Sequence, residues 1–295
     1  MNIIISIPAY NEEKTIGKVI TDIKKVMNQT KYKYLVLVID DGSKDKTAEI
    51  AKKNGAIVHS HSKNYGLAET FRTEIEKALK LGFDVFVHTD ADGQYLAKDI
   101  PRLINEIKKG YDLVLGSRFR GKIEDMSLLK RIGNKIFSKA ISNIVRYDIK
   151  DCQTGFRAFT KEVAEKIKII SNHTYTQEQI IKTVLNKFKV KEIPIYFAKR
   201  KKGKSRLIKN PFEYAIKAWI NILRIYRDYS PLKFFGCIGS FFSLVGFLIG
   251  LWLFSLFISK GTIGGHLPSA ILSMLLILIG VQIIFFGFLA DMKKS

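Results

Sequence analysis

Two long uncharged stretches near the C-terminus constrain the fold of this chain more than any other feature. No charged residue occurs from Phe234 to Ser259, and a second uncharged run extends from Gly261 to Ala290. Each run exceeds the ~20 residues that cross a bilayer core of ~30 Å, whereas a helix in a soluble core is shorter and has a polar face. We therefore predict a transmembrane hairpin over residues 231–295, with spans at about 234–258 and 267–290.

Charged residues beside the two runs predict the orientation of the hairpin. Basic residues precede the first run and follow the second, and only Lys260 lies between them; the flanking residues are Arg224, Arg227, Lys233, Lys293 and Lys294. The positive-inside rule then places both termini and the large N-terminal domain in the cytoplasm. The expected protein is a multi-pass protein of the cell membrane.

The segment before the hairpin is strongly basic. Residues 199–206 read Lys-Arg-Lys-Lys-Gly-Lys-Ser-Arg, and residues 211–229 place apolar side chains at helical spacing among basic ones. This pattern predicts amphipathic interfacial helices over 211–230. The net charge of +22 indicates an anionic partner. Because the basic run lies one helix away from a membrane span, it favours the lipid bilayer and lipid phosphates over nucleic acid.

Residues 1–210 alternate between two kinds of segment. Short apolar runs of strand type are separated by segments with apolar residues at helical period. The strand-type runs are Ile3–Ile7, Tyr34–Ile39, Ala56–His59, Val85–Thr89, Leu113–Gly116 and Lys191–Ala198. This alternation predicts an α/β domain with a mostly parallel, Rossmann-like sheet covered on both faces.

Polar clusters follow four of these runs, at residues 8–13, 40–43, 90–92 and 116–118. Taken singly, each is ordinary turn or helix-cap chemistry. In a parallel sheet, however, ligands bind beyond the carboxyl ends of the strands, where all four clusters would meet. Asp90 and Asp92 point to the same side of an extended segment, and Gln94 follows. Such oxygen ligands suit Mg²⁺ or Mn²⁺ held against a diphosphate, and a polar turn is the alternative.

These motifs resemble glycosyltransferase family 2, in particular the enzymes that transfer one sugar to a polyprenyl phosphate. Dolichyl-phosphate mannose synthase and dolichyl- or undecaprenyl-phosphate glucosyltransferases are examples. The matching residues are 7–13 (Ile-Pro-Ala-Tyr-Asn-Glu-Glu), 39–43 (Ile-Asp-Asp-Gly-Ser), 64–66 (Asn-Tyr-Gly), 90–94 (Asp-Ala-Asp-Gly-Gln), 116–119 (Gly-Ser-Arg-Phe), 154–157 (Thr-Gly-Phe-Arg) and 200–207 (Arg-x-x-Gly-x-Ser-Arg-Leu). They cover residues 1 to about 210 in the family's order.

The resemblance implies a GT-A fold, a nucleotide-sugar donor and a Mg²⁺ or Mn²⁺ cofactor. The donor would contact Pro8, Tyr10, Glu12, Ile39, Asp41, Asp90, Ala91 and Arg206. The metal would bind Asp90, Asp92 and Gln94, and the acceptor phosphate would bind Arg118, Arg131 and Arg200. Asp92, Arg118 and Arg200 are the implied catalytic residues, and Glu178 is a further candidate in a region that departs from the family pattern.

The implied reaction is transfer of one sugar with inversion. A lipid phosphate carries roughly −1.5 to −2 charges at pH 7, so it is already a nucleophile and needs no catalytic base. His88 lies inside a strand and is expected in the core. The donor remains open between GDP-mannose, UDP-glucose and UDP-N-acetylhexosamine, and the acceptor between dolichyl and undecaprenyl phosphate.

Three other functions fit part of the pattern. A processive polysaccharide synthase shares the donor motifs but needs more spans and a Gln-x-x-Arg-Trp motif, which is absent from the sequence. A haloacid-dehalogenase-type phosphatase uses Asp-x-Asp-Gly but leaves residues 8–13 without a role. A non-enzymatic membrane adaptor has no need of converging carboxylates. Separately, Gly246-x-x-x-Gly250 resembles a helix-packing face, which suggests a homo-oligomer formed through the spans.

Overall fold

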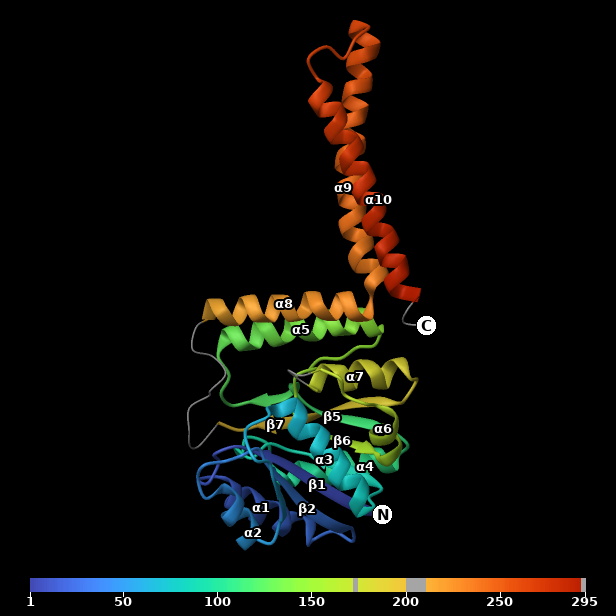
Figure 1. The fold of residues 1–295 in the computed structure, drawn as a ribbon. Coiled ribbons are helices and arrows are strands. Elements are labelled where there is room, and N and C mark those ends of the chain that lie inside the picture. Colours follow the sequence, from blue (N-terminus) through green and yellow to red (C-terminus); the bar gives the residue numbers. More distant parts are fainter. Residues whose placement is uncertain (172–174, 200–210, 293–295) are drawn as a thin grey trace. The chain divides into compact units, whose positions relative to one another are not determined.

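The structure is a computed structural model that describes residues 1–171, 175–199 and 211–292. The chain divides into two compact units, Met1–Pro211 and Phe212–Ser295 (Figure 1). The predicted site residues Arg200 and Arg206 lie outside the described residues.

The first unit is built on a seven-stranded sheet with strand order β3-β2-β1-β4-β6-β5-β7. Its strands are β1 (Asn2–Ala9), β2 (Lys33–Asp40), β3 (Ile57–Ser60), β4 (Val85–His88), β5 (Leu113–Ile123), β6 (Arg157–Thr160) and β7 (Val190–Phe197). β1 pairs in parallel with β2 and β4, β2 with β3, and β5 with β7. Only β6, among the described strands, runs antiparallel to its neighbours β4 and β5. The predicted α/β class with a mostly parallel sheet is confirmed.

Alternate residues of the central strand face opposite sides of the sheet. In β1, Ile3, Ile5 and Ile7 belong to one buried cluster, and Ile4 and Ser6 are buried on the other side. A strand buried on both faces must be almost continuously apolar, which explains the composition of β1. This strand is therefore the centre of the core.

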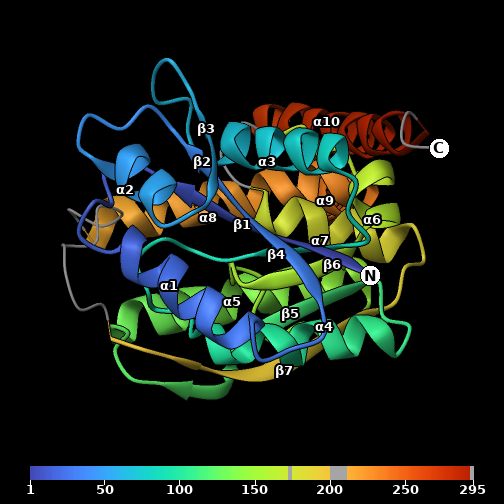
Figure 2. The same ribbon diagram turned by 90° about the horizontal axis from the view of Figure 1, so that it is seen from below.

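Helices cover both faces of the sheet (Figure 2). The face with Ile3, Ile5 and Ile7 packs against α1 (Ile16–Met27), η1 (Ala97–Asp99) and α4 (Ile100–Lys108). The other face is covered by α3 (Leu67–Leu81), α6 (Lys161–Lys166) and α7 (Thr176–Leu185). α2 (Thr47–Lys53) lies beside β3. The loops after β1, β2 and β4 lead to α1, α2 and η1.

Helix α5 (Leu128–Val145) combines a buried side with an exposed apolar row. Phe137, Ile141 and Val145 are buried, whereas Leu128, Ile132 and Ile136 are 72%, 47% and 54% exposed. The exposed residues are four apart and therefore lie on one face of the helix. The first unit thus exposes an apolar row on this helix.

The second unit contains α8 (Pro211–Tyr229) from its second residue onward, α9 (Pro231–Lys260) and α10 (Leu267–Met292). Helix α8 spans the segment predicted as interfacial, and its Trp219 and Leu223 are exposed. Helices α9 and α10 are long and apolar enough to cross a membrane, and few of their side chains are buried. They pack against each other as a hairpin.

Small residues bring α9 and α10 together. Gly239, Gly246 and Gly280 are buried, and the Ser273 hydroxyl donates a 2.7 Å hydrogen bond to the Gly246 carbonyl. A Cβ atom added at Gly246 would lie 2.7 Å from the Ser273 carbonyl oxygen. The small-residue face expected to join separate copies thus contacts α10 of the same chain, and the homo-oligomer stays a prediction.

We expect Gly246→Val to push α9 away from α10 and to destabilise the hairpin by roughly 1–3 kcal/mol, as overpacking does. Gly236→Val is the matched control, because a Cβ atom there meets nothing within 4 Å. Thermal unfolding in detergent measures both. Equal melting temperatures for the two variants would contradict this packing.

Candidate active site

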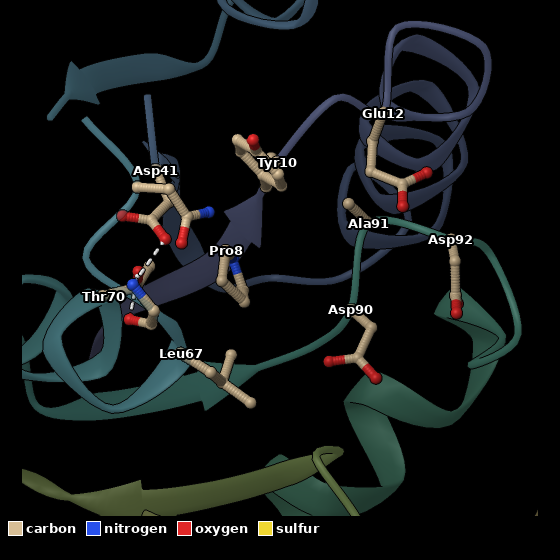
Figure 3. Close-up of a pocket in the computed structure, with 12 residues that line it drawn as sticks. Pro8, Tyr10, Glu12, Asp41, Leu67, Thr70, Asp90, Ala91 and Asp92 are labelled. Atoms are coloured by element: carbon tan, nitrogen blue, oxygen red, sulfur yellow. Dashed lines mark hydrogen bonds between the residues drawn. The ribbon is translucent and has the colours of Figure 1, made fainter. Parts of the chain in front are cut away.

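Three loops at the carboxyl ends of β1, β2 and β4 surround a cavity of about 370 Å³ (Figure 3). The first turn of α3 and the loop before it complete the wall. The lining residues are Pro8, Ala9, Tyr10, Glu12, Asp41, Asn64, Gly66, Leu67, Thr70, Asp90, Ala91 and Asp92. Of the predicted donor-contacting residues, Pro8, Tyr10, Glu12, Asp41, Asp90 and Ala91 therefore lie around one cavity.

Hydrogen bonds join the loop after β1 to the loop after β2 and to the first residue of α2. The Asn11 amide donates to the Ser43 hydroxyl at 2.8 Å, and the Glu12 amide donates to the Thr47 hydroxyl at 2.8 Å. The Lys44 amide returns a 2.8 Å bond to the Asn11 side-chain oxygen. Asn11 has a φ of +53°, a conformation that asparagine adopts more readily than most residues. These bonds hold Tyr10 and Glu12 at the cavity.

Asp41 organises the opposite wall. Its carboxylate accepts hydrogen bonds from the Tyr65 and Gly66 amides, each at 2.9 Å, and pairs with His61 Nδ1 at 2.8 Å. His61 Nε2 in turn lies 2.9 Å from the Thr73 hydroxyl of α3. The Asp41 carboxylate thus fixes the loop of residues 64–66 (Asn-Tyr-Gly), which precedes α3.

Asp90 and Asp92 project from the loop after β4 beside the cavity (Figure 3). The Asp92 carboxylate accepts a 3.0 Å bond from the Gln94 amide. Asp90 rests against Gly155, where an added Cβ atom would lie 2.9 Å from Asp90 Oδ1. A side chain at residue 155 would therefore displace the Asp90 carboxylate.

The carboxylates at the cavity suit a divalent ion that is also coordinated by a substrate. Within residues 1–171, 175–199 and 211–292, no cluster of three or more His, Cys, Asp or Glu residues could hold a metal by itself. Mg²⁺ in phosphate-transfer sites is commonly held by one or two carboxylates together with substrate phosphate oxygens. Asp90 and Asp92 supply two such carboxylates at the cavity.

His88 lies directly behind this loop, in the core as expected. Its side chain is fully buried, with Nδ1 2.7 Å from Glu74 Oε2 and Nε2 2.7 Å from the Tyr175 hydroxyl. Nε2 also lies 3.8 Å from Asp90 Oδ1. Burial alone lowers the pKa of His88, but the Glu74 and Asp90 carboxylates raise it to about 9.

Arg118 forms a buried ion pair with Asp151. Its Nε and Nη2 donate to the Asp151 carboxylate at 2.8 and 2.7 Å, and its backbone amide donates at 2.9 Å. Burial acts to lower the pKa of Arg118, but Asp151, with help from Tyr95 and Asp90, raises it above its ordinary value. The predicted acceptor-binding arginine is thus already paired with a carboxylate.

The remaining predicted site residues lie away from the cavity lining. Ile39 is fully buried in β2, and the Gln94 side-chain amide donates to the Ala198 carbonyl at 3.1 Å. Arg131 is exposed on α5. Glu178 accepts backbone hydrogen bonds from Ile170 and Ser171 and pairs with Lys182, a structural role in α7.

Three lining residues, Ala9, Asn64 and Gly66, belong to the matched motifs but were not predicted as site residues. Sequence reasoning missed altogether the lining residues Leu67 and Thr70. Both belong to the first turn of α3, immediately after the Asn-Tyr-Gly motif. Residues three apart on a helix lie on the same face. The position of Leu67 and Thr70 directly after the motif could therefore have indicated that both line the cavity.

The comparisons with known proteins agree with this geometry. The family model for glycosyl transferase family 2 matches residues 4–168. The chain is 29% identical over 290 residues to the glycosyltransferase AglJ of Haloferax volcanii, covering 98% of this chain and 92% of the relative. It is 33% identical over 205 residues to a dolichyl-phosphate hexose transferase of the same organism, covering 69% and 84%.

A solved structure shares the fold of the first unit. Glucosyl-3-phosphoglycerate synthase of Mycobacterium tuberculosis, in complex with Mn²⁺, uridine diphosphate and glucosyl-3-phosphoglycerate, superposes with a TM-score of 0.59 and 17% identity. The match covers 75% of this chain and 79% of that one. The α/β domain is therefore a glycosyltransferase domain of GT-A type. This chain belongs to glycosyltransferase family 2, as its motifs indicated.

We expect Asp151→Asn to destabilise the protein by about 3–5 kcal/mol, because it leaves the buried Arg118 charge without its partner. Asp148→Asn is the control, since Asp148 is 64% exposed and its ion pairs with Arg120 and Lys150 are at the surface. Thermal unfolding compares the two. An unaltered melting temperature in Asp151→Asn would show that Arg118 does not depend on this pair.

Proposed function

We propose that this protein transfers one sugar, with inversion, from a nucleotide-sugar to a polyprenyl phosphate at the cytoplasmic face of a membrane. The observation that carries the proposal is the cavity that gathers Pro8, Asp41, Asp90 and Asp92 in a chain with two membrane-length helices. The relative named as a dolichyl-phosphate hexose transferase supports a lipid phosphate as the acceptor.

The donor side is formed by two parts of the cavity. Pro8, Tyr10 and Asp41 line the part next to the Asn-Tyr-Gly loop, which we assign to the nucleoside. Asp90 and Asp92 would hold Mg²⁺ or Mn²⁺ against the diphosphate, where the ion supplies positive charge for the leaving group. The Mn²⁺ and uridine diphosphate in the fold relative support this assignment.

The reaction needs no general base from the chain. A phosphate monoester is already anionic at neutral pH, so it attacks the anomeric carbon directly as the nucleoside diphosphate leaves. The titratable side chains among the cavity-lining residues are Tyr10 and the carboxylates of Glu12, Asp41, Asp90 and Asp92. Stabilisation of the departing charge is then the main catalytic requirement.

The acceptor phosphate needs cationic partners. Arg131, exposed on α5, and Arg200 are the proposed ones, because arginine binds phosphate oxygens through two N–H groups at once. Arg118 donates to Asp151 through Nε and Nη2 and its side chain is only 10% exposed, so we assign it to the support of this region. Arg206 remains the proposed partner of the donor diphosphate.

Lipid contact would come from three parts of the chain. Helices α9 and α10 would span the bilayer, and α8 would lie at its surface. The exposed row of Leu128, Ile132 and Ile136 on α5 gives the catalytic domain an apolar face of its own, bordered by the exposed Lys135 and Lys139. Apolar contact combined with basic charge is what binding to an anionic membrane surface requires.

The experiment is a donor screen. Purified protein with Mn²⁺ and a short polyprenyl phosphate is incubated with GDP-mannose, UDP-glucose or UDP-N-acetylglucosamine. We expect lipid that has gained one hexose or one N-acetylhexosamine by mass spectrometry. Longer products would indicate a processive synthase, and intact donors with folded protein would overturn the proposal.

Asp92→Asn tests the role of the carboxylate pair. We expect it to lower turnover by 10²-fold or more, about 2.7 kcal/mol of transition-state stabilisation, while the protein stays folded. Asp125→Asn, at an exposed position outside the cavity lining, should keep wild-type turnover. An Asp92→Asn variant with wild-type turnover would show that the reaction does not depend on this carboxylate.

A further inference from the structure

A buried polar triad links three elements behind the carboxylate loop. Glu74 of α3, His88 at the end of β4 and Tyr175 before α7 are all almost fully buried. His88 Nδ1 faces the Glu74 carboxylate and Nε2 faces the Tyr175 hydroxyl, both at 2.7 Å. Because both ring nitrogens have partners, the imidazole cannot rotate without losing a hydrogen bond.

The aromatic surroundings fix the triad further. The Tyr175 ring stacks on Phe71 with centroids 3.9 Å apart, and the guanidinium carbon of Arg157 lies 5.1 Å from the centroid of the Tyr175 ring. Phe71 also meets the His88 ring edge-on at 5.6 Å. The triad is therefore held in one arrangement by packing as well as by hydrogen bonds.

Folding alone does not explain the triad. Burying polar and charged groups is costly, and apolar residues of similar size often fill such a space at equal or greater stability. Glu74 Oε1 is moreover buried without a hydrogen-bond partner among the residues that the structure describes. A buried polar atom of this kind calls for an explanation beyond packing, and a role at a neighbouring site is one.

The neighbouring site is the Asp90 carboxylate. His88 Nε2 lies 3.8 Å from Asp90 Oδ1, and Gly155 lies against the same carboxylate from another side. We infer that His88, fixed by Glu74 and Tyr175, is a positioning residue that orients Asp90 for the divalent ion and the donor diphosphate. Partners behind a metal ligand set its orientation, and their loss typically weakens metal binding 10- to 100-fold.

This inference rests on the proposed function, and two substitutions of one residue test it. His88→Gln places an amide where Nε2 lies, facing Asp90, whereas His88→Asn places one where Nδ1 lies, facing Glu74. We expect His88→Asn to weaken Mn²⁺ binding at least tenfold, and His88→Gln to stay within about threefold of wild type. The measurement is Mn²⁺ affinity by electron paramagnetic resonance, in the presence of UDP and of GDP.

A control and a second test variant separate positioning from packing. Phe86→Leu changes another fully buried side chain of β4 and should lower the melting temperature without altering Mn²⁺ affinity. Tyr175→Phe keeps the ring stack but removes the hydroxyl, and should weaken Mn²⁺ binding in the same direction as His88→Asn.

Each outcome decides a separate point. Equal losses in His88→Gln and His88→Asn, or wild-type affinity in His88→Asn, would overturn the positioning role. If the wild-type protein failed to bind Mn²⁺ both in the presence of UDP and in the presence of GDP, the proposed function would be overturned. The inference would then be overturned with it.

Discussion

The parallel pairing of β1 with β2 and β4 is the constraint on which the site depends. Parallel neighbours end at the same edge of a sheet, so the loops after these three strands must meet. The Asn11 and Glu12 amides donate hydrogen bonds to the loop after β2 and to the start of α2, and the Asp41 carboxylate accepts one from the loop before α3. Loops far apart in sequence are thereby held as one rigid wall, which makes recognition of a fixed ligand shape possible.

Much of this arrangement was predictable from the sequence because it follows from local patterns. The continuous apolar runs gave the parallel strands, and the polar residues after them gave Tyr10, Asp41, Asp90 and Asp92 as neighbours. The uncharged runs gave α9 and α10. These features need only the period of a strand or helix and the direction of a parallel sheet.

What was not predictable depends on contacts between distant residues. Strand β6 is only four residues long and begins with Arg157, whose burial is possible because its guanidinium bonds to Gln179 and to backbone carbonyls. The Gln94 side chain turns to Ala198, more than a hundred residues later. The pairing of Arg118 with Asp151 likewise joins a strand to a distant loop. These partners are distant in the sequence, so no local pattern identifies them. The roles predicted for such residues were therefore based on their motifs and not on their actual contacts.

The antiparallel direction of β6 has a separate consequence for how this site can diversify. Because β6 runs against β4, its amino end lies at the edge where β4 ends, and Gly155 thus reaches Asp90. The connection between α5 and β6, residues 146–156, enters the site from the side opposite the loops after β1 and β2. Insertions or deletions in that connection would reshape the surroundings of Asp90 while leaving the Asp41 wall unchanged. The two halves of the site can therefore vary independently on one scaffold.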